Sequence, residues 1–188
     1  ATHISTYSLT VEERTPLHKL VALGRVVPEG DELLRERYEF THRYLAEAGF
    51  EHYEVSSFAR PGHRSRHNEG YWTHETMIGL GPSAHSFWRE TRSRGWRWAD
   101  VAHLGRWQGL LLAGESPIDW REQIGPDELA DEAILLGLRR LVDGLDVDRL
   151  AIDYGIDLLT DKRAELAALE GAGLVEVSPR RVRLTLDG

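Results

Sequence analysis

The segment from Ser65 to Gly95 constrains the fold of this chain more than any other part of its sequence. It places arginine, histidine, asparagine and tryptophan residues on both sides of a turn, Gly79-Leu-Gly81-Pro82. Buried cores do not have this composition, because charged side chains are almost never fully buried unless they are paired. The segment therefore predicts a surface that faces a ligand.

The remaining composition is that of an ordinary globular protein. The chain has 188 residues, of which 41% are hydrophobic and 29% are charged, enough for one large domain or two small ones with a real core. No apolar run approaches the ~20 residues of a membrane-spanning helix. The chain has no cysteine, which excludes disulfides and thiolate metal ligands. Together with the lack of a secretory leader, this favours a cytoplasmic protein.

Charge divides the chain unevenly. Residues 115–188 contain 17 acidic and 9 basic residues, whereas the other 114 residues contain 14 of each. We therefore expect a ligand-facing domain over residues 1–114 and an acidic accessory domain over residues 115–188. Glycine and proline residues interrupt the apolar pattern of the sequence within Leu110–Pro126, and we place the boundary between the two domains there. Because the sequence opens on Ala1 directly in a strand pattern, we expect it to be part of a longer protein.

The first domain is expected to alternate strands and helices. Thr2–Leu9 has the alternation of a strand, and residues 31–48 carry apolar residues at helical spacing. Phe50–Phe58 predicts a second strand, Ala59–Thr76 a long loop, and Met77–Trp88 a turn followed by a strand. Strand, helix and strand in this order predict a βαβ unit with a parallel sheet, so the expected fold class is α/β.

The periodicity changes after Pro126. A helix is predicted over Asp127–Leu141, followed by two shorter helices over Asp146–Ile152 and Asp157–Leu169. A hairpin is predicted from strands over Leu174–Val177 and Val182–Leu186. Three helices followed by a two-stranded wing are the outline of a small winged-helix-like α+β domain.

Four motifs together resemble one known family. They are His3–Thr10, Tyr53–Arg60, Arg66-His67-Asn68-x-x-Tyr71-Trp72 and Gly79-Leu-Gly81-x-x-Ala84-His85-Ser86. The chain resembles the radical-SAM haem chaperones, which are relatives of oxygen-independent coproporphyrinogen III oxidase. The third and fourth motifs are the most specific, because such polar and aromatic pairs at this spacing rarely occur by chance. The chain departs from the family pattern at Arg14, Ser57, Glu69 and Ser83.

The resemblance implies a fold, cofactors and a set of site residues. Members of this family have a partial (β/α) barrel that binds a 4Fe–4S cluster and S-adenosylmethionine, and this chain would supply its last βα units. The cluster is held by a CxxxCxxC motif that this cysteine-free chain lacks, so we expect the C-terminal portion of such a protein, unable to hold the cluster or act as an enzyme alone. The resemblance assigns no catalytic and no metal-binding residue here. It assigns S-adenosylmethionine binding to Thr10, Gly79, Gly81 and His85, and haem or porphyrin binding to Arg66, His67, Tyr71, Trp72 and Arg89.

The chemistry of these residue types fits the ligands, and each also has a structural explanation. Porphyrins present carboxylates beside an apolar disc, and arginine pairs with carboxylates while tryptophan packs on the disc. Arg66, however, could be a solvated surface charge, and His67 with Asn68 could fold the loop through backbone hydrogen bonds. His85 could be a core histidine bonded to a backbone carbonyl. Glycines at 79 and 81 would let backbone amides approach a ligand closely.

Two alternative functions remain open. The first is that of the oxidase relatives, which decarboxylate the propionates of coproporphyrinogen. The second is a non-catalytic winged-helix module that binds nucleic acid through Arg180, Arg181 and Arg183, although the net charge of −8 in residues 115–188 opposes phosphate binding. The expected partners are haem or porphyrin and an unidentified haem acceptor. Self-association is also expected through the exposed edge of Thr2–Leu9.

Overall fold

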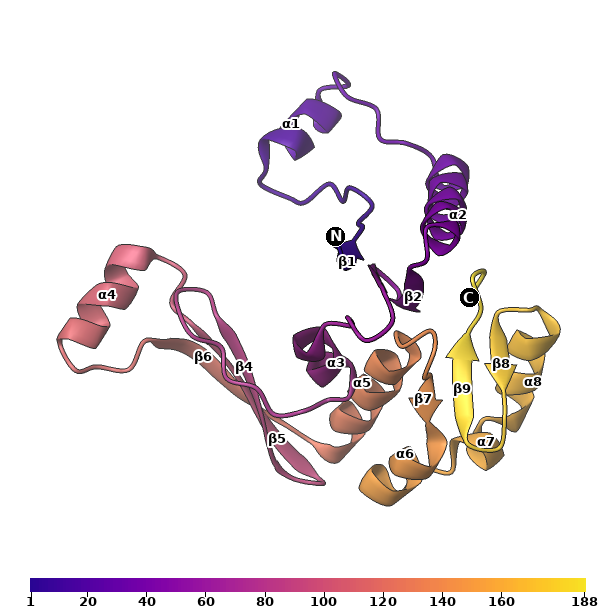
Figure 1. Ribbon diagram of the computed structural model, residues 1–188. Coiled ribbons are helices and arrows are strands. Elements are labelled where there is room, and N and C mark those ends of the chain that lie inside the picture. The colour runs from indigo at the N-terminus through magenta and orange to yellow at the C-terminus, as the bar shows by residue number, and fades with distance from the viewer. The chain divides into compact units, whose positions relative to one another are not determined.

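The computed structural model describes all residues from 1 to 188. The chain divides into two compact units, residues 1–64 and residues 65–188, and each is described by itself. Figure 1 shows the order of the elements along the chain. No helix is both long and apolar enough to cross a membrane.

The first unit contains a small antiparallel sheet and two helices. Strand β1 (His3–Ser5) is followed by α1 (Pro16–Ala22), α2 (Asp31–Glu47), β2 (Glu51–Glu54) and β3 (Ser57–Ala59). The strand order is β1-β3-β2, and both pairings are antiparallel. The core of this unit is formed by Leu45, Phe50 and Phe58, with Ile4 packed against them.

Two expectations for this unit are corrected. The strand expected over Thr2–Leu9 is limited to His3–Ser5. The parallel βαβ pairing is wrong, because the segment Phe50–Phe58 is not one strand. The chain reverses between β2 and β3, so β3 lies between β1 and β2 and pairs antiparallel with each. Alternation of side chains predicted the strands, but it carries no information about the direction of their neighbours.

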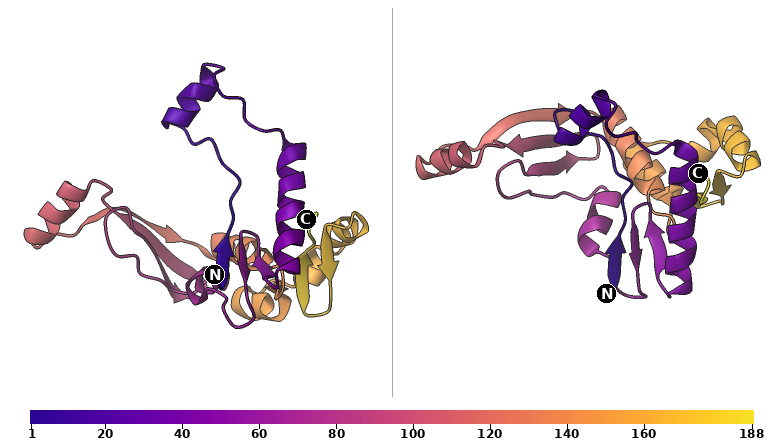
Figure 2. Two further views of the ribbon diagram at one scale, coloured as in Figure 1. Left: turned by 45° about the horizontal axis from the view of Figure 1, so that its top comes forward. Right: turned by 90° about the horizontal axis from the view of Figure 1, so that it is seen from above.

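The second unit begins with a short helix and a long antiparallel sheet. Helix α3 (Arg66–Trp72) is followed by β4 (His85–Thr91), β5 (Arg94–Asp100), α4 (Leu104–Leu112) and β6 (Ile118–Ile124). The strands are ordered β4-β5-β6. Both views in Figure 2 show this sheet as an extended ribbon with α4 beyond its end. Helix α3 lies inside the segment that the sequence predicted to be a loop.

The rest of the second unit contains four helices and three short strands. The elements are α5 (Pro126–Leu138), β7 (Leu145–Asp146), α6 (Val147–Tyr154), α7 (Leu158–Asp161), α8 (Arg163–Gly171), β8 (Val175–Val177) and β9 (Arg181–Leu184). The third sheet has the order β7-β9-β8 and is antiparallel. The helices and the hairpin lie close to the predicted ranges, while the winged-helix description stays a prediction.

Apolar side chains from these helices and strands form one core. Leu150, Leu158, Leu166 and Val182 are buried in it together with Leu145, Val147 and Val175. Leu129 of α5 is fully buried in a second cluster with Phe87 and Ile124, and this cluster attaches α5 to the long sheet. Leu169, which the periodicity placed inward, is 40% exposed. The periodicity also placed other residues inward that are only partly buried, namely Leu136, Leu141, Leu174, Val177 and Leu184, so it predicted part of this core.

The domain boundary predicted within Leu110–Pro126 can be tested by limited proteolysis. Strand β6 pairs with β5 along its length, whereas the residues between Leu112 and Ser116 are exposed and lie outside the regular elements. We expect cleavage in this connection and a stable fragment that contains residues 127–186, detected by mass spectrometry. Cleavage scattered through residues 127–186 would contradict a separate C-terminal domain.

Gly144 is expected to be required for stability. Its φ is +69°, and a Cβ at this position would overlap the side chain of Arg183 and lie 2.7 Å from the carbonyl oxygen of Val182. Gly144→Ala should lower the free energy of unfolding by at least ~1–2 kcal/mol, measured by urea denaturation. Gly171→Ala is the matched control, because nothing lies within 4 Å of that position and its φ is not positive. Equal stability of the two variants would contradict the prediction.

Candidate functional site

Helix α3 positions the first group of predicted site residues. Its N-terminus is capped by Ser65, whose Oγ accepts a hydrogen bond of 3.3 Å from the backbone N–H of Asn68. The helix ends at Trp72, and two residues later His74 adopts a positive φ of 57°. This reversal directs the chain from α3 back toward the long sheet, where the second group of predicted residues lies.

Tyr71, Trp72 and His85 line one cavity of about 420 Å³. Its size is within the range of small-molecule sites. The wall combines the end of α3 with strand β4 and helix α5, and Met77 adds a thioether to it. The remaining lining residues are His74, Glu75, Ser86, Phe87, Arg97, Glu132 and Leu136. The structure thus brings together three residues that the sequence assigned to two different ligands.

Arg66 and His67 are exposed in the first turn of α3 and do not line this cavity. The ring of His67 contacts the ring of Tyr71 edge-on, with 4.7 Å between the centroids. His67 is therefore connected to the cavity through Tyr71, one helical turn further along. Both the Arg66 guanidinium and the His67 imidazole are free to meet a ligand that extends out of the cavity.

His85 lines this cavity from β4, whereas Gly79 and Gly81 do not line it. His85 is exposed on β4 and contacts Trp120 edge-on at 5.7 Å between centroids, so it is not a core histidine. A Cβ on Gly79 would overlap the carbonyl oxygen of His85, and the Gly79 N–H donates to Ser86 Oγ at 3.0 Å. Gly79 thus lets two segments of backbone approach each other. Gly81 has a φ of +120°, a conformation that favours glycine.

Thr10 belongs to the first unit. It is exposed, and its neighbours Leu9 and Val11 line a cavity of about 580 Å³ within that unit. Tyr7, Leu34 and other side chains of α1, α2 and their connections complete this cavity.

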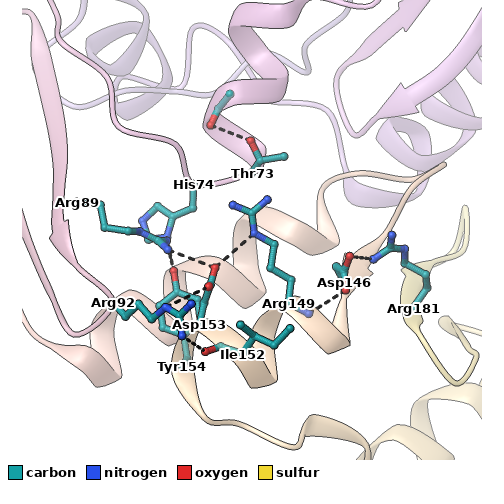
Figure 3. A network of polar contacts seen from close by, with 11 residues as sticks. Thr73, His74, Arg89, Arg92, Asp146, Arg149, Ile152, Asp153, Tyr154 and Arg181 are labelled. Carbon is teal, nitrogen blue, oxygen red and sulfur yellow. Dashed lines mark hydrogen bonds and ion pairs between the residues drawn. The ribbon is translucent and has the colours of Figure 1, made fainter.

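A polar network connects His74 and Arg89 with the residues at the end of α6 (Figure 3). Arg89 extends from β4, and its Nη2 donates to Nδ1 of His74 at 3.0 Å and to the hydroxyl of Tyr154. Its Nη1 lies 3.6 Å from the carboxylate of Asp153. Arg89 is therefore engaged within the protein, in contrast to Arg66. A cavity of about 90 Å³ adjoins this network and is too small for a porphyrin.

His74 is the buried centre of this network. Its imidazole stacks on Phe87 with 4.4 Å between the centroids. Because the guanidinium of Arg89 can only donate hydrogen bonds, Nδ1 of His74 must be the acceptor. The proton of the neutral ring is therefore on Nε2, which lies 3.2 Å from the carboxylate of Glu132. Glu132 also forms an ion pair with Arg97, in which Nη2 of Arg97 lies 2.5 Å from Oε1 of Glu132. Burial, reinforced by the positive charge of Arg89, lowers the pKa of His74 to about 4, so this histidine is neutral at pH 7.

Trp72 connects the cavity with the polar network. Its ring packs against the guanidinium of Arg139, which lies 4.4 Å from the ring centroid. Trp72 and His74 line both the larger and the smaller cavity. Sequence analysis did not single out His74 or Tyr154. The only signal was the position of His74 two residues after the Tyr-Trp pair, since its partners are up to 80 residues away.

Comparisons with known proteins identify the family of this chain. The HemN C-terminal domain pattern matches residues 124–188. The haem chaperone HemW of Mycobacterium tuberculosis is 36% identical over 186 residues, which cover 99% of this chain and 44% of that protein. HemW of Bacillus subtilis is 31% identical over 188 residues, covering 100% of this chain and 48% of that protein. The chain belongs to the HemW/HemN-like radical-SAM family.

The part of the family that this chain represents follows from the same matches. It spans less than half the length of these curated relatives and corresponds to a C-terminal portion. In fold it is similar to coproporphyrinogen III oxidase (HemN) from Escherichia coli, a radical SAM enzyme, with a TM-score of 0.59 and 18% identity. That match covers 89% of this chain and 42% of the oxidase. The mixed helix and sheet structure is therefore an α/β fold related to this family.

The pKa of His74 predicts how stability depends on pH. In the unfolded chain a histidine titrates near 6.5, whereas in the folded protein His74 titrates at about 4. Between these values the unfolded state binds one more proton, so the free energy of unfolding decreases as the pH falls from 6.5 to 4. His74→Asn tolerates the positive φ but does not titrate. We expect this variant to be less stable at pH 7 but to lose less stability on acidification, measured by urea denaturation.

The control for this experiment is His63→Asn, because His63 is exposed. It should keep the pH profile of the parent protein. An unchanged profile in the His74 variant would show that His74 is protonated alike in the folded and unfolded states.

Proposed function

We propose that this chain is the haem-handling C-terminal part of a radical-SAM haem chaperone. The observation that carries the proposal is the cavity of about 420 Å³ beside Tyr71, Trp72 and His85, in a chain whose relatives include haem chaperones over its whole length. Haem transfer, S-adenosylmethionine binding and cluster binding are proposed for the intact protein. The domain division at residues 114 and 115 and a cytoplasmic location belong to the same proposal.

The chemistry of haem suits the side chains around this cavity. Haem is an apolar disc with two carboxylates and an iron that accepts imidazole. Tyr71 and Trp72 offer aromatic surface for the disc, and His67 offers an exposed imidazole beside Tyr71. Arg66 offers an exposed guanidinium for a propionate. Arg89 would have to exchange Asp153 for a propionate, so its proposed contact with haem has less support than that of Arg66.

S-adenosylmethionine binding by the intact protein is proposed for Thr10 of the first unit and for Gly79, Gly81 and His85 of the second unit. The exposed imidazole of His85 and the open space around Gly81 support this assignment. The chain offers no cysteine thiolate for a 4Fe–4S cluster, so its residues do not fit the cluster, and no radical step is assigned to them. An activity like that of the oxidase relatives is an alternative for the intact protein.

The nucleic-acid alternative has less support. Its candidate phosphate ligands Arg180, Arg181 and Arg183 are paired with acidic side chains of the same domain. Arg180 lies 2.8 Å from Asp148, Arg183 lies 2.5 Å from Glu176, and Arg181 pairs with Asp146. Phosphate binding would have to displace three carboxylates in a domain that is already acidic.

Titration with haem tests the proposed site. Arg66→Ala should weaken haem binding by ~1–3 kcal/mol, because a propionate would lose its charged partner. His67→Ala should shift the Soret band of the complex, because the iron would lose an imidazole. His85→Ala should impair S-adenosylmethionine binding by the full-length protein more than haem binding. Affinities and spectra are measured by absorbance titration.

His18→Ala is the matched control, since His18 is an exposed histidine in the first unit. It should bind haem like the parent protein. If the Arg66 and His67 variants bind like the parent while a substitution in residues 127–188 abolishes binding, the proposed haem site is in the wrong place.

A further inference from the structure

Strand β6 is a long and regular edge strand. It comprises seven residues, Ile118–Ile124, contains neither proline nor glycine, and has β5 as its only neighbouring strand. All of its residues except Ile124 are exposed. Helix α4 lies past the start of the strand and not along its outer edge (Figure 1). The outer edge therefore presents backbone N–H and C=O groups that can pair with another strand.

We propose that β6 pairs antiparallel with β6 of a second copy of this chain, with Trp120 at the centre of the pairing. The two three-stranded sheets would then form one continuous six-stranded sheet. A two-fold axis perpendicular to the sheet relates the copies, so the assembly closes as a dimer. The proposal does not rest on the proposed function, although Trp120 also contacts His85 of the candidate site.

The alternation of side chains restricts the possible registers. Successive side chains point to opposite faces, and a two-fold axis perpendicular to the sheet keeps each face continuous. One residue must therefore lie on the axis, opposite its own copy. With Asp119, Arg121 or Glu122 at the centre, two like charges would face each other, which is destabilising. Among the central positions of the strand, only Trp120 avoids this conflict.

The register centred on Trp120 is also complementary in charge. It places Asp119 of each copy opposite Arg121 of the other, which gives two pairs of opposite charge. It places the two Trp120 rings opposite each other, and aromatic pairs across strands stabilise a sheet. Ile118 then faces Glu122, so no like charges are opposed. The sequence Asp-Trp-Arg is thus self-complementary in this register and in no neighbouring one.

These side chains are available for such pairing. Trp120 is 40% exposed, and Arg121 makes no ion pair within its own chain. Asp119 lies 3.6 Å from Arg106, and both side chains are at least half exposed, so this pair contributes little stability. A second copy would supply the opposite charge that Arg121 lacks.

The mass of the protein in solution tests the proposal. We expect the parent chain to be a dimer by analytical ultracentrifugation. Arg121→Asp places Asp119 opposite a second acid and should raise the dimer dissociation constant at least tenfold. Asp119→Arg combined with Arg121→Asp restores the two opposite-charge pairs with their signs exchanged, and should restore the dimer. A monomeric parent, or a double variant as weak as the single one, would overturn the proposal.

Disulfide cross-linking tests the register, because the chain has no cysteine of its own. Trp120→Cys would face its own copy and should form an intermolecular disulfide on mild oxidation. Glu122→Cys would face Ile118 and should not. Ser5→Cys reports on association through the edge of β1 instead. Equal cross-linking at position 122, or efficient cross-linking at position 5 with none at position 120, would overturn the proposal.

Discussion

The stacking and hydrogen bonding of His74 hold the second unit together around the candidate site. Its imidazole stacks on the ring of Phe87 of β4 and accepts a hydrogen bond from Arg89 of the same strand. Its Nε2 lies beside the carboxylate of Glu132 of α5. Tyr154 at the end of α6 closes the group. Helix α3, the long sheet and two helices of the acidic segment thus meet at one neutral ring. The cavity beside Trp72 keeps its shape because these elements cannot shift independently.

The hydrophobic pattern predicted much of the secondary structure but not the pairing of strands. The helices of residues 126–171 and the hairpin that follows lie close to the expected ranges, because each has an apolar face that packs on the common core. The direction of β3 was missed, since it depends on a reversal between two short strands. Helix α3 was missed because Asn68 and Gly70 favour loops. Ser65, which caps this helix, was the signal that would have predicted it.

The candidate site was predicted in part for similar reasons. Tyr71, Trp72 and His85 were found from their motifs, and the structure places them around one cavity. His74 could not be found in this way, because its role arises from contacts with residues 13 to 80 positions away. Arg66 and His67 share a helix with the cavity residues but do not line the cavity. Sequence motifs therefore identified residues near the cavity, but they did not distinguish the residues that line it from residues that lie close by.

Trp72 is a partition between two cavities, one about 420 Å³ and the other about 90 Å³. The larger one is lined by aromatic and apolar side chains together with Glu75, Arg97 and Glu132, and the smaller one adjoins the charged groups of Arg89 and Asp153. His74 lines both cavities as well, and a smaller residue at position 72 would widen both of them. The indole thus forms part of the wall of both cavities, and its size is constrained from both sides at once.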